Sequence, residues 1–139
     1  MRWNRALAAI ALVLLMASTP PAACAETAID EAMREAFREL LRDARGGAAR
    51  TEVAGFVVRL PRGTYAIVRW PEAELMDQGR WEGPWPPGTV AIVHTHPNWM
   101  PAPSGIDRAT AATHRVFVYV VTSNGIARTA GTAVETVPW

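Results

Sequence analysis

Apolar residues between positions 29 and 44 recur at the spacing of one face of a helix. Seven of them are separated by acidic residues and arginines: Ile29, Met33, Ala36, Phe37, Leu40, Leu41 and Ala44. This period predicts an amphipathic helix over about residues 28–45. The pair Gly46-Gly47 follows and is typical of a helix end.

Beyond this helix the pattern changes to short β-rich runs. Residues 51–60 and 64–70 flank the turn Pro61-Arg62-Gly63 and predict a β-hairpin. Further strands are predicted over residues 89–96, 116–122 and 126–129, the last two joined by a tight turn at 123–125. Residues 71–88 contain four prolines, three glycines and two tryptophans, which predict an irregular loop.

A second helix is predicted from the N-cap residue Ser104 to about residue 113. The element order is then helix, three strands, helix, two strands. This order indicates an α/β (α+β) fold with a mixed sheet of about five to six strands, flanked by two main helices. The length of 139 residues suits one compact domain.

The N-terminal segment has the three parts of a secretory signal peptide. Residues 1–5 carry two arginines, residues 6–17 are apolar, and residues 18–25 are small and proline-broken. Ala23-Cys24-Ala25 fits the cleavage rule, so residues 1–25 are predicted to be removed and residues 26–139 to form the domain. The protein is therefore expected to be exported, as a periplasmic or secreted protein.

Cys24 permits a second interpretation, in which the protein begins at an acylated Cys24 and is anchored as a lipoprotein. Pro21 stands where such signals usually have leucine, which favours the soluble form. Cleavage after Ala25 would leave no cysteine, and no disulfide could form.

The charge balance argues against a nucleic-acid partner. The whole chain has 14 basic and 13 acidic residues. Loss of Arg2 and Arg5 with the signal peptide leaves twelve basic residues against thirteen acidic ones, a net charge of −1. No basic patch and no transmembrane segment are predicted in residues 26–139. The oligomeric state has no sequence signal.

Two histidines and an aspartate form the strongest chemical pattern. His94 and His96 are two residues apart on a predicted strand and so share one face. Asp107 follows at the start of the second helix, where Ser104 and Asp107 also suit an ordinary helix cap. Two imidazoles and one carboxylate with an open fourth position suit a catalytic zinc ion. The cap alone does not explain the two histidines.

Glu52 lies near the start of the first predicted strand. It shares a strand face with Ala54, Phe56 and Val58, so its carboxylate borders an apolar face. By spacing alone, a solvated glutamate at a strand end is the favoured interpretation of Glu52.

The segment from His94 to Asp107 resembles the JAMM motif of the JAB/MPN metallopeptidases. His94-Thr95-His96-Pro97 is followed, after the seven residues from Pro97 to Pro103, by Ser104 and Asp107. Glu52, three residues before Gly55 and an apolar run, is similar to the upstream glutamate segment of that family. The resemblance extends over most of residues 28–129 and implies the family's cytidine-deaminase-like fold.

The resemblance also implies a role for each matching residue. His94, His96 and Asp107 would bind one Zn²⁺ per chain. Glu52 would be the general acid/base that moves a proton from the attacking water to the leaving amine. Ser104 would donate a hydrogen bond to the oxyanion.

The expected activity is zinc-dependent hydrolysis of peptide or isopeptide amide bonds. The substrate would be a peptide or protein, with peptidoglycan stem peptides or the tail of a partner protein as candidates. A secreted or envelope zinc-containing binding or effector module with little turnover is the alternative. A zinc nucleoside deaminase is set aside, because that chemistry needs a Cys-x-x-Cys ligand pair.

The remaining aromatic and histidine residues give weaker signals. His114, at the end of the second predicted helix, is expected to be structural, and Trp70 to pack in a loop. Trp81, Trp85 and Trp99 lie on loops near the predicted metal ligands. Whether these three line a substrate cleft or pack ordinarily is left open.

Overall fold

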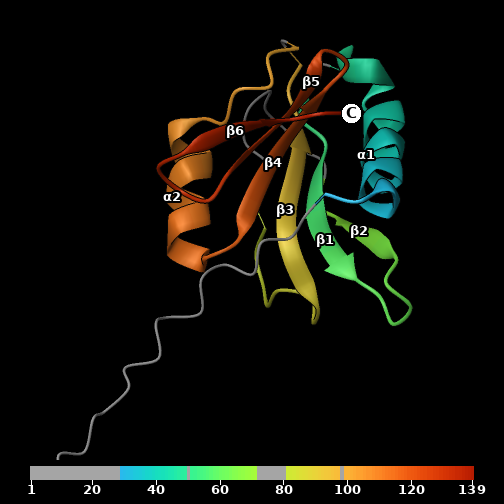
Figure 1. Ribbon diagram of the computed structural model, residues 1–139, viewed down its shortest axis with the longest axis vertical. Helices are drawn as coiled ribbons and strands as arrows, with labels where there is room; N and C mark the ends of the chain where they lie inside the picture. Colours follow the sequence, from blue (N-terminus) through green and yellow to red (C-terminus); the bar gives the residue numbers. More distant parts are fainter. Residues whose placement is uncertain (1–28, 50, 72–80, 98) are drawn as a thin grey trace, which may run out of the picture.

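The computed structural model of the chain describes residues 29–49, 51–71, 81–97 and 99–139 (Figure 1). The elements in chain order are α1 (Glu31–Asp43), a 3-10 turn η1 (Arg45–Gly47), β1 (Ala54–Arg59), β2 (Tyr65–Arg69), β3 (Thr89–Thr95), α2 (Gly105–His114), β4 (Phe117–Thr122), β5 (Gly125–Thr129) and β6 (Val134–Val137). The predicted signal peptide at residues 1–25 and Cys24 lie outside the described residues. No helix in the described part of the chain is long and apolar enough to cross a membrane.

The strands form one six-stranded sheet in the order β2-β1-β3-β4-β5-β6. Strands β3 and β4 run parallel, joined by the crossover helix α2, and the other neighbouring pairs are antiparallel. Two helices on a mixed sheet confirm the predicted α+β fold. The crossover brings the start of α2 close to the carboxyl end of β3.

The sixth strand, β6, has no counterpart among the individually predicted strands. It pairs with β5 through Val134 to Val137 at the edge of the sheet. Only Val137 of its four residues is buried. A four-residue edge strand with one buried side chain has little hydrophobic pattern, although Val134, Thr136 and Val137 are β-formers.

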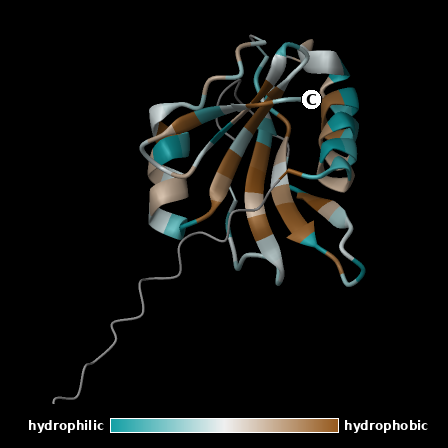
Figure 2. Cartoon of the chain, in the orientation of Figure 1, coloured by the Kyte–Doolittle hydropathy of each residue, from teal (hydrophilic) through white to brown (hydrophobic). Residues whose placement is uncertain are grey.

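Helix α1 covers one face of the sheet. Met33, Phe37 and Leu40 are fully buried in a cluster with residues of β1, β3 and β4, and the rings of Phe37 and Tyr119 lie 5.1 Å apart. The helix begins after Asp30, whose carboxylate accepts a hydrogen bond from Met33 N at 2.9 Å. Figure 2 shows much of α1 in hydrophilic colours and the central strands in hydrophobic ones.

Helix α2 and several tryptophans cover part of the opposite face. Phe56 is fully buried there and its ring lies between 5.0 and 5.3 Å from those of Trp70, Trp81 and Trp85. Trp85 also packs on His114, with ring centroids 4.5 Å apart. His114, expected to be structural because of its place at the end of the helix, thus has an aromatic packing partner.

Candidate metal centre

The register of β1 against β3 places Glu52 opposite His96. Ala54 pairs with His94 in this antiparallel pair. The same register continues beyond the strand ends, because Thr95 N donates to Val53 O at 3.0 Å and Val53 N donates to Thr95 Oγ1 at 3.1 Å. Cross-strand partners project from the same face, and Glu52 Oε1 lies 3.6 Å from His96 Nε2.

The two histidines direct the same ring nitrogen toward one point. Their Nε2 atoms are 3.0 Å apart, and the rings are tilted by 49°. Two nitrogens that share a tetrahedral zinc at about 2.0–2.1 Å are about 3.3–3.4 Å apart. The pair is therefore within a few tenths of an ångström of the spacing of two ligands of one ion.

Asp107 serves the helix cap and the site at once. Its Oδ2 accepts a hydrogen bond from Ser104 N at 2.6 Å, and Ser104 Oγ accepts one from Asp107 N at 3.2 Å. This is a complete capping box at the start of α2. The other carboxylate oxygen, Oδ1, lies 3.5 Å from His94 Nε2. The cap thus holds Asp107 with one oxygen directed to the histidines.

Donor atoms of Glu52, His94 and His96 all lie within 4.8 Å of one another and could hold a metal ion. Asp107 approaches this group from the side of His94 and is not a member of it at that separation. All four side chains are at most 16% exposed. Imidazole nitrogens and carboxylate oxygens are donors that zinc binds, so the residues present fit such an ion.

His94 is prepared for this role by its environment. Burial lowers the pKa of His94 from its ordinary value to about 4, the neighbouring Asp107 carboxylate opposing this and His96 adding to it. His94 is therefore neutral near pH 7, and a neutral imidazole can give a lone pair to a metal ion.

The loop between β3 and α2 adds a feature that the sequence did not predict. His96 Nδ1 lies 3.0 Å from the main-chain oxygen of Met100. Because a carbonyl only accepts, this contact places the proton on Nδ1 and leaves the Nε2 lone pair for the site. A residue of any type can supply a main-chain acceptor, so the sequence pattern could not reveal the contact between His96 and Met100.

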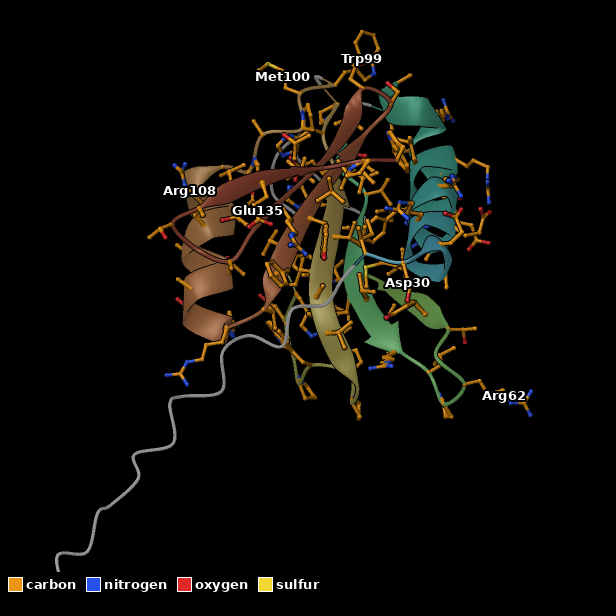
Figure 3. All side chains as sticks on the ribbon, in the orientation of Figure 1. Asp30, Arg62, Trp99, Met100, Arg108 and Glu135 are labelled. Atoms are coloured by element: carbon orange, nitrogen blue, oxygen red, sulfur yellow. The ribbon has the colours of Figure 1, made fainter. Side chains whose placement is uncertain are left out.

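Trp81, Trp85 and Trp99, the tryptophans considered as walls of a substrate cleft, lie in different environments. Trp81 and Trp85 pack around Phe56, and Trp99 is 50% exposed at one end of the molecule beside Met100 (Figure 3). A pocket that includes Glu52 has Trp70 in its wall, together with Arg45 and Arg69, and none of the three loop tryptophans. Trp70 thus packs on Phe56, as expected, and also lines this pocket.

A comparison with known families gives one match. The sequence model of the family described as prokaryotic homologs of the JAB domain matches residues 31–136. The match runs from the first residue of α1 into β6 and includes Glu52, His94, His96, Ser104 and Asp107. No curated protein matches the chain.

Proposed function

This chain belongs to the prokaryotic JAB-domain family, and we propose that it is a zinc-dependent hydrolase of peptide or isopeptide amide bonds. His94, His96 and Asp107 are the proposed ligands. The observation that carries the proposal is the convergence of Glu52, His94 and His96 within 4.8 Å, with an Asp107 oxygen 3.5 Å from His94. A bound zinc ion supplies a Lewis acid that polarises a carbonyl and lowers the pKa of water.

Glu52 is the proposed general acid/base. Its carboxylate lies beside His96 and is mostly shielded from solvent, yet it borders a pocket that a substrate could enter. A carboxylate at this place can accept a proton from the attacking water and return it to the leaving amine. The β1–β3 register holds it there, because Val53 and Thr95 are joined by one main-chain hydrogen bond and by a second from Val53 N to the Thr95 hydroxyl.

Ser104 is the proposed donor to the oxyanion. Its Oγ accepts the hydrogen bond from Asp107 N, so its own hydrogen remains available for donation. A hydroxyl held at a helix start can stabilise charge that develops on the substrate carbonyl oxygen. Ser104 would thus cap α2 and contribute to turnover at the same time.

The proposed substrate is a peptide or protein met outside the cytoplasm. This follows from the signal peptide predicted at residues 1–25, with acylation of Cys24 as the alternative route to the same side of the membrane. Peptidoglycan stem peptides and the tail of a partner protein are candidates.

Digestion of a peptide library by the purified protein, read by mass spectrometry, tests the proposal. We expect cleavage by zinc-loaded protein, loss of cleavage after chelation, and recovery when zinc is returned. The Glu52→Gln variant should retain zinc and cleave little. Stoichiometric zinc without cleavage of any peptide would favour the binding or effector module instead.

A further inference from the structure

A pocket of about 710 Å³ adjoins the candidate metal centre. Its wall is formed by the carboxyl end of α1, the turn η1, the segment that leads into β1, and the residues at the end of β2. Glu52 belongs both to this wall and to the donor cluster with His94 and His96. The volume is in the range of small-molecule sites, so a substrate group next to the reacting bond has room there.

Two residues of this wall each carry a buried hydrogen-bond donor that has no acceptor. Arg69 Nη1 and Trp70 Nε1 are the buried side-chain polar atoms without a partner in the described part of the chain. Both groups donate only, so what they lack is an acceptor. Buried donors left unpaired are costly and rare, and here two of them are consecutive residues that line one pocket.

The wall carries two guanidinium groups and two carboxylates, so an anion would be held by direct contact with a guanidinium and not by an excess of positive charge. Arg69 Nη2 donates to Asp43, and its side chain is about one-third exposed (34%). Arg45 is exposed and has no ion pair with another described residue. The wall thus has two guanidinium groups and, apart from the Glu52 carboxylate that faces His96, a single carboxylate. A guanidinium fork matches the two oxygens of a carboxylate.

We propose that this pocket is a substrate subsite that binds a carboxylate group close to the scissile amide bond. Arg45 and Arg69 bind the carboxylate, and the indole N–H of Trp70 donates to an oxygen of the same substrate segment. Arg69 Nη1 and Trp70 Nε1 both have almost no exposed surface, so engaging either donor requires a small rotation of its side chain. The subsite rests on the proposed hydrolase function. Its ligand is either the C-terminal carboxylate of a peptide or an acidic side chain.

Binding to zinc-loaded Glu52→Gln protein tests the subsite without any turnover. The probes are N-acetyl-alanyl-alanine, its C-terminal amide, and N-acetylglutamate with its α-carboxyl amidated, each titrated by calorimetry. We expect at least one carboxylate probe to bind about tenfold or more tightly than the neutral amide. Preference for the first or the third probe identifies the source of the carboxylate. Equal binding of all three overturns the proposal.

Arginine variants then locate the binding. Arg45→Gln and Arg69→Gln in the same background should each reduce the carboxylate preference by about tenfold. Arg62→Gln is the matched control, since Arg62 lies at the tip of the β1–β2 hairpin, far from Trp99 at the site end (Figure 3). Arg45 is exposed, so its variant remains informative if Arg69→Gln fails to fold. Equal loss in Arg62→Gln would show a general charge effect and overturn the proposal.

Hydrolysis gives the second readout. The peptide library is made with free and with amidated C-termini, and with and without acidic residues. The value of kcat/KM for peptides with a carboxylate should exceed that for neutral peptides by more than about tenfold. This ratio should fall in Arg45→Gln. Carboxylate binding without cleavage would mean that the hydrolase function fails and the pocket stands. Equal cleavage of peptides with and without a carboxylate would mean that the pocket proposal fails and the hydrolase function stands.

Discussion

The indole ring of Trp99 lies directly against Gly47. A Cβ built on Gly47 would come within 2.6 Å of Trp99 Cδ1, closer than side chains approach in folded proteins. Trp99 itself has φ +58°, and its main-chain oxygen accepts a hydrogen bond from Asn124 Nδ2 at 3.3 Å. Next in the chain, the Met100 oxygen lies 3.0 Å from His96 Nδ1. Gly47 thus supports the loop that orients a proposed metal ligand.

We expect Gly47→Ala to weaken zinc binding by about 10–100-fold, the usual effect of disturbing the groups behind a ligand histidine. The added methyl group would displace Trp99 and with it the Met100 oxygen. The measurement is zinc affinity by competition with a chelating dye. Gly46→Ala is the matched control, because Gly46 also has positive φ (+67°) but a Cβ added there would meet nothing within 4 Å. Equal zinc affinity in the two variants would contradict this support role.

Glu52 and Asp107 should respond differently to removal of their charge. Glu52→Gln is expected to retain about one zinc per chain while turnover falls by roughly 10²–10⁴-fold, since a general acid/base acts in the transition state. Asp107→Asn and His96→Ala should lose zinc, because they remove proposed ligands. Zinc and turnover are to be measured on the same samples. Loss of zinc in Glu52→Gln with retention in Asp107→Asn would instead identify Glu52 as the ligand, which its place in the donor cluster permits.

Ser104→Ala should have two separable effects. Loss of the cap of α2 is expected to cost about 1 kcal/mol of unfolding free energy, and loss of the hydroxyl donor should reduce turnover by roughly 10²–10³-fold. Asp30→Ala provides the comparison, because Asp30 caps α1 through Met33 N and belongs to no part of the site. Denaturant unfolding and kcat are measured for both variants. A similar loss of kcat in both would indicate that Ser104 acts through stability alone.

The two tyrosines predict a stability limit at alkaline pH. Burial raises the pKa of Tyr119 above its ordinary value of 10.0, with Arg128 opposing, and burial also raises the pKa of Tyr65, with Asp30 adding to it. The unfolded chain therefore loses these protons first. The contribution of the two tyrosines to folding stability is complete below about pH 10 and is lost as pH rises through their folded-state pKa values.

Denaturant midpoints measured at about pH 8 and at about pH 10.5 test this effect. Tyr119→Phe should show a smaller decrease in the denaturant midpoint between the two pH values. The decrease that remains should be the contribution of Tyr65. An unchanged loss in a variant that lacks both hydroxyl groups would rule out this cause.

Export can be tested by the intact mass of the protein recovered from its host. The predicted cleavage gives a chain that starts at Glu26, and the lipoprotein alternative gives an acylated Cys24. In either case residues before position 24 should be absent. Retention of Met1 would refute both forms and would remove the argument for an extracytoplasmic substrate.

Much of the fold could be predicted because its signals are local. The apolar stripe of α1, the β-rich runs of β1 to β5 and the cap of α2 at Ser104 are all periodic or short-range features. The spacing of His94, His96, Ser104 and Asp107 is likewise readable along the chain. Strand β6 was not predicted separately, since its place depends on pairing with β5 rather than on a hydrophobic pattern of its own.

The sequence by itself therefore determined the elements apart from β6, and the placing of His94 and His96 on one face. The tertiary structure decided which residues from other segments lie beside these two histidines. Taken alone, Glu52 suits a solvated strand end, and only the β1–β3 register places it opposite His96. Arg45 and Arg69 could not be distinguished from the other arginines until the turn η1 and strand β2 brought them into one wall. The physical reason is that main-chain pairing between distant segments sets which side chains meet, and the spacing of residues along one segment does not encode that register.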